Sequence, residues 1–261
     1  MFRFYEMIVR KFLFFNRWQY RFNKEVSQAI KEINKEKSEK ENIAFIAEEV
    51  KNKGVFILNE ALSSSTLQAF RKEYNKFFES EESQFYAVDK HDGAVCIRVK
   101  PLWTVKNMFK FPITLSFFNV NSFDKITKRF YKNRTDKIHF MSEIFVHNTP
   151  ETTEPLSGGL HWDRAQTLKF WIYLNDLEVE NGPMRIELDS VQKNAAIRSS
   201  AKDPSKLVGG VDNIVEPENE VVYLTAPAGS VMIHDTDASH GATPVAKGKQ
   251  RQIIRGHCRA N

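Results

Sequence analysis

The sequence predicts a mainly β fold, a β-sandwich or jelly roll with a flank of helices at its N-terminal end. Before residue 80, apolar residues recur every three or four positions, which is the period of an amphipathic helix. From about residue 94 onward, short apolar runs alternate with Gly, Pro, Asn and Asp, which is typical of strands joined by turns. Helices that precede a long run of strands indicate this architecture.

Helix and strand signals follow one another along the chain. Residues 24–53 are rich in Lys and Glu and predict one or two solvated helices, and Gly54 precedes a short buried strand over 55–58. The serines at 63–65 can cap a helix that continues to Phe77. Further strands are predicted over residues 94–99, 138–147, 167–175, 184–188, 220–224, 230–234 and 250–257. We therefore expect a helical N-terminal segment, residues 1–53, and one β domain, residues 54–261.

The composition is that of a globular chain. Hydrophobic residues make up 41% and charged residues 27% of its 261 positions, which excludes a disordered chain. No apolar run approaches the length of a membrane-spanning helix. The two cysteines, Cys96 and Cys258, are too few for a disulfide scaffold or a thiolate zinc site. The N-terminus lacks a signal-peptide pattern, so we expect a reducing, cytoplasmic setting.

The net charge of +5 is concentrated at the N-terminal end. Residues 1–24 contain six basic residues and one acidic residue, whereas the rest of the chain contains 32 of each. A neutral main body does not offer the broad basic surface that nucleic acids need. We therefore expect no nucleic-acid partner. The sequence indicates no oligomeric state.

The same 24 residues predict a basic amphipathic helix. Its large apolar residues are spaced by three or four positions: Phe4, Ile8, Phe12, Phe15, Trp18 and Phe22. Three interpretations stay open. The helix packs against the domain with its basic residues solvated, it lies on an anionic membrane surface and makes the protein peripheral there, or it binds a partner protein.

The chemistry points to a metal site. The chain has no Gly-x-Gly-x-x-Gly, phosphate-loop, His-Glu-x-x-His or Gly-x-Ser-x-Gly motif, but it has His161-Trp162-Asp163 after Gly158-Gly159-Leu160. On a strand, residues i and i+2 share a face about 6.6 Å apart, so His161 and Asp163 can reach one metal ion. The candidates for a third ligand are His139, His147, His234, His240 and His257.

His240 is the best placed of these candidates, because it lies in a short polar stretch after the apolar strand around Ile233. Two histidines and a carboxylate on one face of an iron ion leave three coordination positions for a cosubstrate and oxygen. Arg251 follows eleven residues later, and a guanidinium can hold the distal end of a dicarboxylate through a bidentate pair. Arg255 has the same strand parity and is the alternative anchor.

Four features of the chain occur in a characteristic order: His161-Trp162-Asp163, the turn Asn181-Gly182-Pro183-Met184, the turn Ala228-Gly229-Ser230, and His240 followed by Arg251. In these features the chain resembles the phytanoyl-CoA dioxygenase-like family of Fe(II)/2-oxoglutarate-dependent dioxygenases. The resemblance covers about residues 54–257. It implies a double-stranded β-helix, which is a jelly roll of two sheets.

The resemblance also implies the cofactors and their ligands. Fe(II) would be held by the catalytic triad of His161, Asp163 and His240, with 2-oxoglutarate chelating the iron and O2 as the oxidant. Arg251 would pair with the C5 carboxylate of 2-oxoglutarate. Trp171 falls where members of the family often have a tryptophan near the cosubstrate, and plain core packing is the alternative for it. Strand alternation puts one set of residues on one face, Leu168, Phe170, Ile172 and Leu174, and a second set on the other, Lys169, Trp171 and Tyr173.

The reaction implied is the hydroxylation of an unactivated C–H bond with release of succinate and CO2. Asp163 is retained, whereas halogenating relatives replace this carboxylate. The family's usual Gly-Ser-His-Lys is replaced here by the segment 189–193, so the substrate class does not transfer. A small molecule, a lipid and a lipid-linked glycan all remain open. The alternative function is a cupin-like, metal-containing sugar-binding module without oxygenase activity, which would have no need of Arg251.

Overall fold

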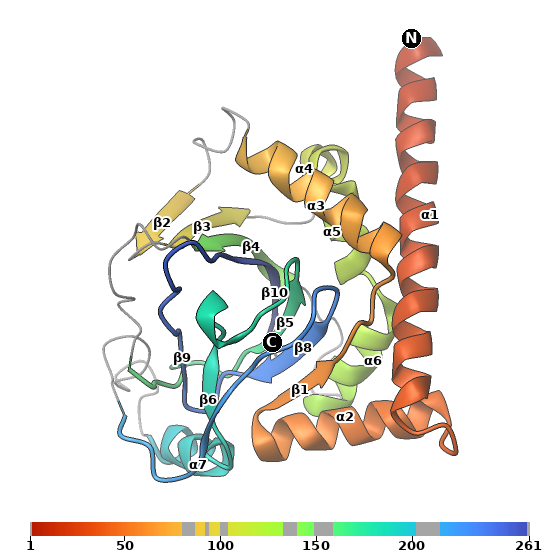
Figure 1. Ribbon diagram of the computed structural model, residues 1–261. Helices are drawn as coiled ribbons and strands as arrows, with labels where there is room; N and C mark the ends of the chain where they lie inside the picture. Colours follow the sequence, from red (N-terminus) through yellow and green to blue (C-terminus); the bar gives the residue numbers. More distant parts are fainter. Residues whose placement is uncertain are drawn as a thin grey trace.

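The computed structural model describes residues 2–79, 87–91, 94–99, 104–132, 140–148, 159–201 and 215–259. In these ranges the strands form a curved, two-sheet arrangement with helices stacked on one side of it (Figure 1). The arrangement confirms the mainly β fold with a helical flank that the sequence predicts.

The larger sheet is antiparallel and has the strand order β1-β8-β5-β10-β4-β3-β2. Its strands are β1 (Val55–Leu58), β2 (Ala87–His91), β3 (Ala94–Val99), β4 (Phe140–Asn148), β5 (Leu168–Tyr173), β8 (Val231–Asp235) and β10 (Arg251–Cys258). The smaller sheet has the order β7-β6-β9, formed by β7 (Val221–Tyr223), β6 (Arg185–Glu187) and β9 (His240–Gly241). A bridge between His161 and His240 extends it. Two facing sheets of this kind form the double-stranded β-helix.

Seven α-helices are described, together with the 3-10 turn η2 (Val179–Asn181): α1 (Phe2–Ile33), α2 (Glu39–Lys53), α3 (Ser64–Phe78), α4 (Val105–Lys110), α5 (Pro112–Phe118), α6 (Asn121–Phe130) and α7 (Val191–Ser200). The Ser38 side chain caps α2 in a reciprocal box with Glu41, and Gly54 ends it in a left-handed conformation. Gly54 thus turns the chain directly into β1. The sequence did not predict α4, α5, α6 or α7, and α1 continues past residue 24 to Ile33.

Apolar side chains form two cores, one on each face of the larger sheet. The larger core lies between that sheet and the helices, and it is rich in phenylalanine. The smaller core lies between the two sheets and includes Trp171, Tyr173, Ile186 and Met232. Along β5, Phe170 belongs to the first core and Trp171 to the second, as strand alternation predicts. The face of β5 with Trp171 therefore points into the barrel.

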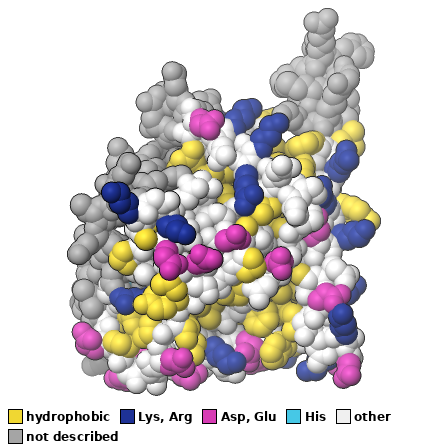
Figure 2. Space-filling view, viewed as in Figure 1, with side chains coloured by type: hydrophobic (Ala, Val, Ile, Leu, Met, Phe, Trp, Pro, Cys, Tyr) yellow, Lys and Arg dark blue, Asp and Glu magenta, His cyan; other side chains and the backbone are white. Residues whose placement is uncertain are grey.

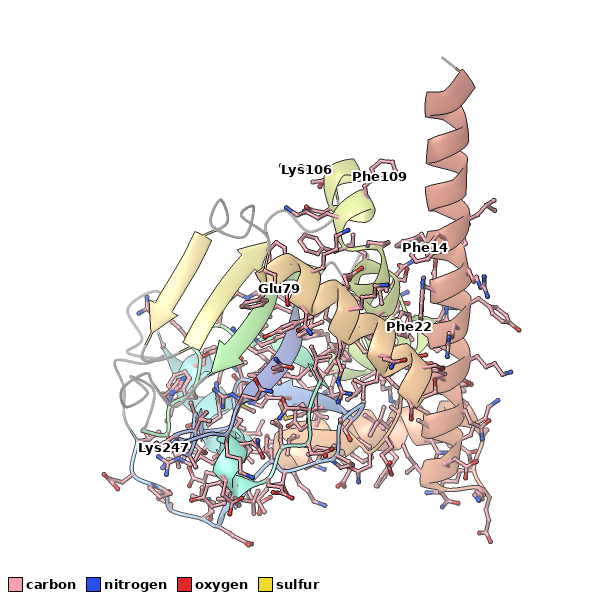
Figure 3. The ribbon with its side chains drawn as sticks, turned by 45° about the horizontal axis from the view of Figure 1, so that its top comes forward. Phe14, Phe22, Glu79, Lys106, Phe109 and Lys247 are labelled. Carbon is pink, nitrogen blue, oxygen red and sulfur yellow. The ribbon has the colours of Figure 1, made fainter. Side chains whose placement is uncertain are left out.

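The N-terminal helix is packed along part of its length. Phe15 and Phe22 are buried, whereas Phe12 is 56% exposed. The Phe22 ring lies 5.2 Å from that of Phe70 on α3 and 5.3 Å from that of Phe117 on α5, and Figure 3 shows it pointing from α1 toward these helices. The side chains of residues 1–11, which include Phe4 and Ile8 of the predicted apolar stripe, lie outside the described residues. None of the described helices combines the length and apolar character that crossing a membrane requires.

Candidate active site

The structure brings the three predicted metal ligands together. Ligand atoms of His161, Asp163 and His240 all lie within 4.8 Å of one another. His161 and His240 face each other across an antiparallel bridge, with backbone hydrogen bonds of 2.8 and 2.7 Å, and their ring centroids are 4.6 Å apart. The Asp163 Oδ1 atom lies 3.9 Å from His240 Nε2. The His-x-Asp pair and the third ligand thus come from two neighbouring segments of the smaller sheet.

The ring nitrogens of the two histidines have different surroundings. Nδ1 of His240 lies 2.8 Å from the carbonyl oxygen of Ala238, and Nδ1 of His161 lies 3.5 Å from that of Gly159. A proton on Nδ1 leaves Nε2 as the metal-binding atom. Burial lowers the pKa of both rings, to about 3 for His240, so both are neutral at neutral pH.

Asp163 is held in its charged form. Burial alone would raise its pKa, but the nearby charge of Lys169, together with the hydrogen bond that Lys169 donates, outweighs burial and lowers this pKa. Lys169 Nζ donates to Asp163 Oδ2 at 2.8 Å. Two neutral imidazoles and one carboxylate facing a common point are the donor set of a non-haem Fe(II) site with open positions. The residues present therefore fit the metal.

The segment before His240 is fixed by contacts with two other parts of the chain. The backbone N–H of Asp163 donates to the Thr236 carbonyl at 2.9 Å. On the other side, Asn194 of α7 donates to the carbonyl of Asp237 at 2.7 Å, and the guanidinium of Arg198 forms a bidentate pair with the Asp237 carboxylate. Residues 231–241 are buried throughout. The position of His240 is therefore set by packing from both sides.

The two arginines of β10 lie at different heights in the barrel. Arg251 is 7% exposed and donates to the carbonyl of Gly182. Gly182 has φ +68°, and a Cβ there would lie 2.7 Å from the oxygen of Thr243, so this turn needs glycine. Arg255 is opposite Trp171 in the sheet, with its Cζ 4.9 Å from the Trp171 ring centroid. On β10, His257 pairs with Lys169. Arg255 is two residues from His257, whereas Arg251 is six residues away.

Trp171 borders the interior of the barrel. Its side chain is 8% exposed, and its Nε1 has no hydrogen-bond partner among the described residues. A buried N–H donor of this kind normally has a partner. The position suits a role beside a bound cosubstrate as well as a role in the smaller core.

The other histidine candidates do not join the triad. His234 is fully buried on β8, and its ring centroid lies 4.5 Å from that of His240. His257 is opposite Lys169 on β10. His147 is in β4, opposite Gln252, and its side chain, like the whole of His139, lies outside the described residues. Within the described chain, only His161, Asp163 and His240 cluster as metal ligands.

The sequence predicted the strand face on which Lys169 lies but not its contact with Asp163. Lys169 is 7% exposed and is the only charged residue of β5. A charged residue within an otherwise apolar strand could have indicated this contact, because a lysine is rarely buried without a partner. Its partner, Asp163, lies six positions earlier in the sequence.

The fold is similar to solved structures of non-haem α-ketoglutarate-dependent enzymes. The epimerase SnoN from nogalamycin biosynthesis matches with a TM-score of 0.62 and 12% identity, over 83% of this chain and 82% of that one. The carbocyclase SnoK from the same biosynthesis matches with a TM-score of 0.58 and 17% identity, over 82% of each chain. HygX from Streptomyces hygroscopicus, solved with nickel, 2-oxoglutarate and hygromycin B, matches with a TM-score of 0.56 and 9% identity, over 83% and 87%. At these identities the likeness shows the fold.

A family-level comparison of the sequence goes further. No curated protein sequence matches the chain. The sequence profile described as Phytanoyl-CoA dioxygenase (PhyH) matches residues 50–253, a stretch that includes the triad, Trp171 and Arg251. The chain therefore belongs to the phytanoyl-CoA dioxygenase family of Fe(II)- and 2-oxoglutarate-dependent dioxygenases.

Proposed function

We propose that this dioxygenase hydroxylates an unactivated C–H bond and that His161, Asp163 and His240 are its iron ligands. One observation carries the proposal: the ligand atoms of three side chains from two segments lie within 4.8 Å of one another. The two rings are neutral and the carboxylate is charged, which is the protonation state that metal binding needs.

The bound iron would bind 2-oxoglutarate and oxygen and would supply the oxidising chemistry. His161 and His240 would contribute their Nε2 atoms and Asp163 its Oδ1 atom. Arg251 would hold the C5 carboxylate of 2-oxoglutarate by a charge-assisted pair, and Trp171 would border the cosubstrate. The products are the hydroxylated substrate, succinate and CO2.

Hydroxylation is favoured over halogenation because Asp163 keeps the carboxylate that halogenating relatives replace, and the triad leaves three coordination positions for the cosubstrate and oxygen. The fold also serves other outcomes, since SnoN is described as an epimerase and SnoK as a carbocyclase. Product analysis by mass spectrometry separates them. A hydroxylated product gains one oxygen atom, whereas an epimer keeps the mass of the substrate.

We propose that the substrate is a small molecule, a lipid or a lipid-linked glycan. Whether the exposed part of α1 binds a membrane distinguishes the lipid-carried substrates from the small molecules. HygX, which shares the fold, was solved with the small molecule hygromycin B. On this chain, Phe12, Leu13 and Tyr20 are 56%, 62% and 74% exposed on α1, and Figure 2 shows yellow apolar and dark-blue basic side chains along the edge formed by this helix. An apolar and basic helix face suits an anionic membrane surface, which would bring the enzyme to a lipid-carried substrate.

The test of the function is turnover of 2-oxoglutarate. The full-length protein, loaded with Fe(II) and supplied with O2, should convert 2-oxoglutarate to succinate, with a rate that rises when a panel of small molecules and lipids includes the substrate. The His161→Ala protein is the control and should release no succinate. If the Fe(II)-loaded protein neither binds nor turns over 2-oxoglutarate, the oxygenase proposal fails. Sugar binding by the metal-loaded protein would then support the alternative function.

A further inference from the structure

Lys169 is a buried cation inside the barrel. It lies on the face of β5 that also carries Trp171, and its backbone is paired on one side with His234 of β8 and on the other with His257 of β10. Its side chain is 9% exposed. Because strands on both sides hold the backbone, the base of this side chain is fixed in place.

The two oxygens of Asp163 have different neighbours. Oδ2 accepts a hydrogen bond from Lys169 Nζ at 2.8 Å. Oδ1 lies 3.9 Å from His240 Nε2, on the side where the ligand atoms of the triad gather. The Lys169 ammonium group therefore hydrogen-bonds to Oδ2 and leaves Oδ1 free to bind the metal.

We infer that Lys169 is a positioning residue that holds the Asp163 carboxylate so that a single oxygen faces the metal. The inference rests on the proposed role of the triad. A carboxylate can bind a metal ion through one oxygen or through both, and binding through both would take up one of the positions needed for 2-oxoglutarate and oxygen. Contacts of this kind behind a ligand commonly fix its orientation.

The positive charge of Lys169 has a second effect on metal affinity, opposite in sign to the effect of its hydrogen bond. The positive charge of Lys169 repels a divalent cation, so removing it by itself strengthens metal binding. Removing the hydrogen bond frees the carboxylate to rotate and weakens metal binding. Whether metal affinity falls or rises when Lys169 is replaced therefore distinguishes a positioning role of Lys169 from a purely electrostatic role.

The experiment measures Co(II) binding to the full-length apo protein. Lys169→Met removes both the donor and the charge at nearly the same length, and Lys169→Arg keeps both. We expect Lys169→Met to weaken Co(II) binding by about 10- to 100-fold, Lys169→Arg to restore it, and 2-oxoglutarate binding to the Co(II)-loaded protein to weaken in the methionine variant. The matched control is Lys193→Met, which removes a half-exposed lysine paired with Glu218 at 2.6 Å and should change neither affinity.

The outcomes separate this inference from the proposed function. If Lys169→Met binds Co(II) as tightly as the wild type or more tightly, Lys169 does not position Asp163. If the wild type itself binds no Co(II), the triad is wrong and the proposed function fails with it. Lys169→Leu makes the same comparison if the methionine variant does not fold, as judged by circular dichroism, because leucine suits a strand whose other residues are apolar and buried.

Discussion

At the scale of single residues, the triad depends on each histidine having one ring nitrogen turned to a backbone carbonyl and the other turned to a common point. Replacing His161 or His240 by alanine leaves one imidazole and one carboxylate. Two such ligands hold Fe(II) poorly, so we expect either variant to lose Fe(II) binding and succinate release. Iron content after dialysis and the turnover of 2-oxoglutarate measure these losses.

Folding of the two alanine variants is the control for this prediction. Neither ring belongs to the two apolar cores, so the circular dichroism spectrum should match that of the wild type. A variant that keeps full iron occupancy and turnover would refute the assigned ligands.

Arg251→Ala tests the anchor for 2-oxoglutarate. Losing a charge-assisted pair costs about 1.5–3 kcal/mol, which is roughly 10- to 150-fold in affinity. We therefore expect the KM for 2-oxoglutarate to rise by about that factor. Arg255→Ala is the matched variant, because it also removes a guanidinium from the inner face of β10. If Arg255→Ala shows the larger defect, Arg255 is the anchor.

The sequence predicted which residues meet but not what holds them. His161 and Asp163 share a strand face by simple alternation, and His240 and Arg251 follow at a spacing that the family resemblance makes informative. The bidentate pair of Arg198 with Asp237 and the bond of Lys169 to Asp163 depend on how separate elements pack. No local pattern in the sequence encodes such contacts.

At the scale of elements, the C-terminal end of β8 makes the stability of the fold depend on pH. Asp235 is fully buried, and burial, followed by the charge of Asp237, raises its pKa to about 8. It is therefore neutral at neutral pH in the folded protein, whereas an unfolded aspartate ionises near pH 4. A folded pKa above the unfolded value means that stability is lost as the pH rises between these two values.

Asp235→Asn should remove this dependence. We expect the free energy of unfolding of the wild type to fall, relative to the variant, by up to about 1.4 kcal/mol per pH unit between about pH 5 and about pH 8. Gln166 Nε2, which donates to Asp235 Oδ2 at 3.0 Å, can rotate its amide to accept from the new asparagine. Urea unfolding across this range gives the slope. Asp124→Asn, on the surface beside Lys128, controls for the loss of a carboxyl group, and equal slopes for wild type and Asp235→Asn would contradict the assignment.

Strands were predicted better than helices. The strands at 94–99, 184–188, 220–224, 230–234 and 250–257 agree with the structure within two residues at each end, because turn residues bound short apolar runs. The helices α4, α5 and α6 are six to ten residues long, which is too short for a clear apolar period. The start of α5 is capped from another helix, since the backbone N–H groups of Ile113 and Thr114 donate to the Glu73 carboxylate at 2.9 Å each. Such a cap is invisible in the local sequence.

At the scale of the whole molecule, the helix that holds the net charge has two different parts. Its first turns extend beyond the other elements in Figure 1, while Phe15 and Phe22 are buried against the body. Deleting residues 1–24 would therefore remove Phe15 and Phe22 from the larger core and destabilise the fold. Point substitutions on the exposed face test membrane binding without that damage.

The triple variant Phe12→Ser, Leu13→Ser and Tyr20→Ser should bind anionic vesicles more weakly than the wild type. These side chains are exposed, so the thermal midpoint should not change. The basic residues of α1 are tested separately. Attraction of a basic residue to an anionic membrane surface contributes about 1 kcal/mol to binding, and this contribution falls as the salt concentration rises. Arg17→Glu should therefore reduce the salt-sensitive part of vesicle binding. Cosedimentation with phosphatidylserine-containing vesicles at low and high salt measures both effects.

The matched control for this prediction is a second triple variant, Val179→Ser, Ile197→Ser and Tyr223→Ser. These residues are 41–48% exposed but lie on other elements, so a general loss of surface hydrophobicity would affect both triple variants equally. A specific loss in the α1 variant assigns the surface to α1. Equal binding by all forms, or no binding by the wild type, would exclude membrane attachment through α1. The substrate proposal would then narrow to small molecules, because no other surface in the described part of the chain has been assigned to a lipid-carried substrate.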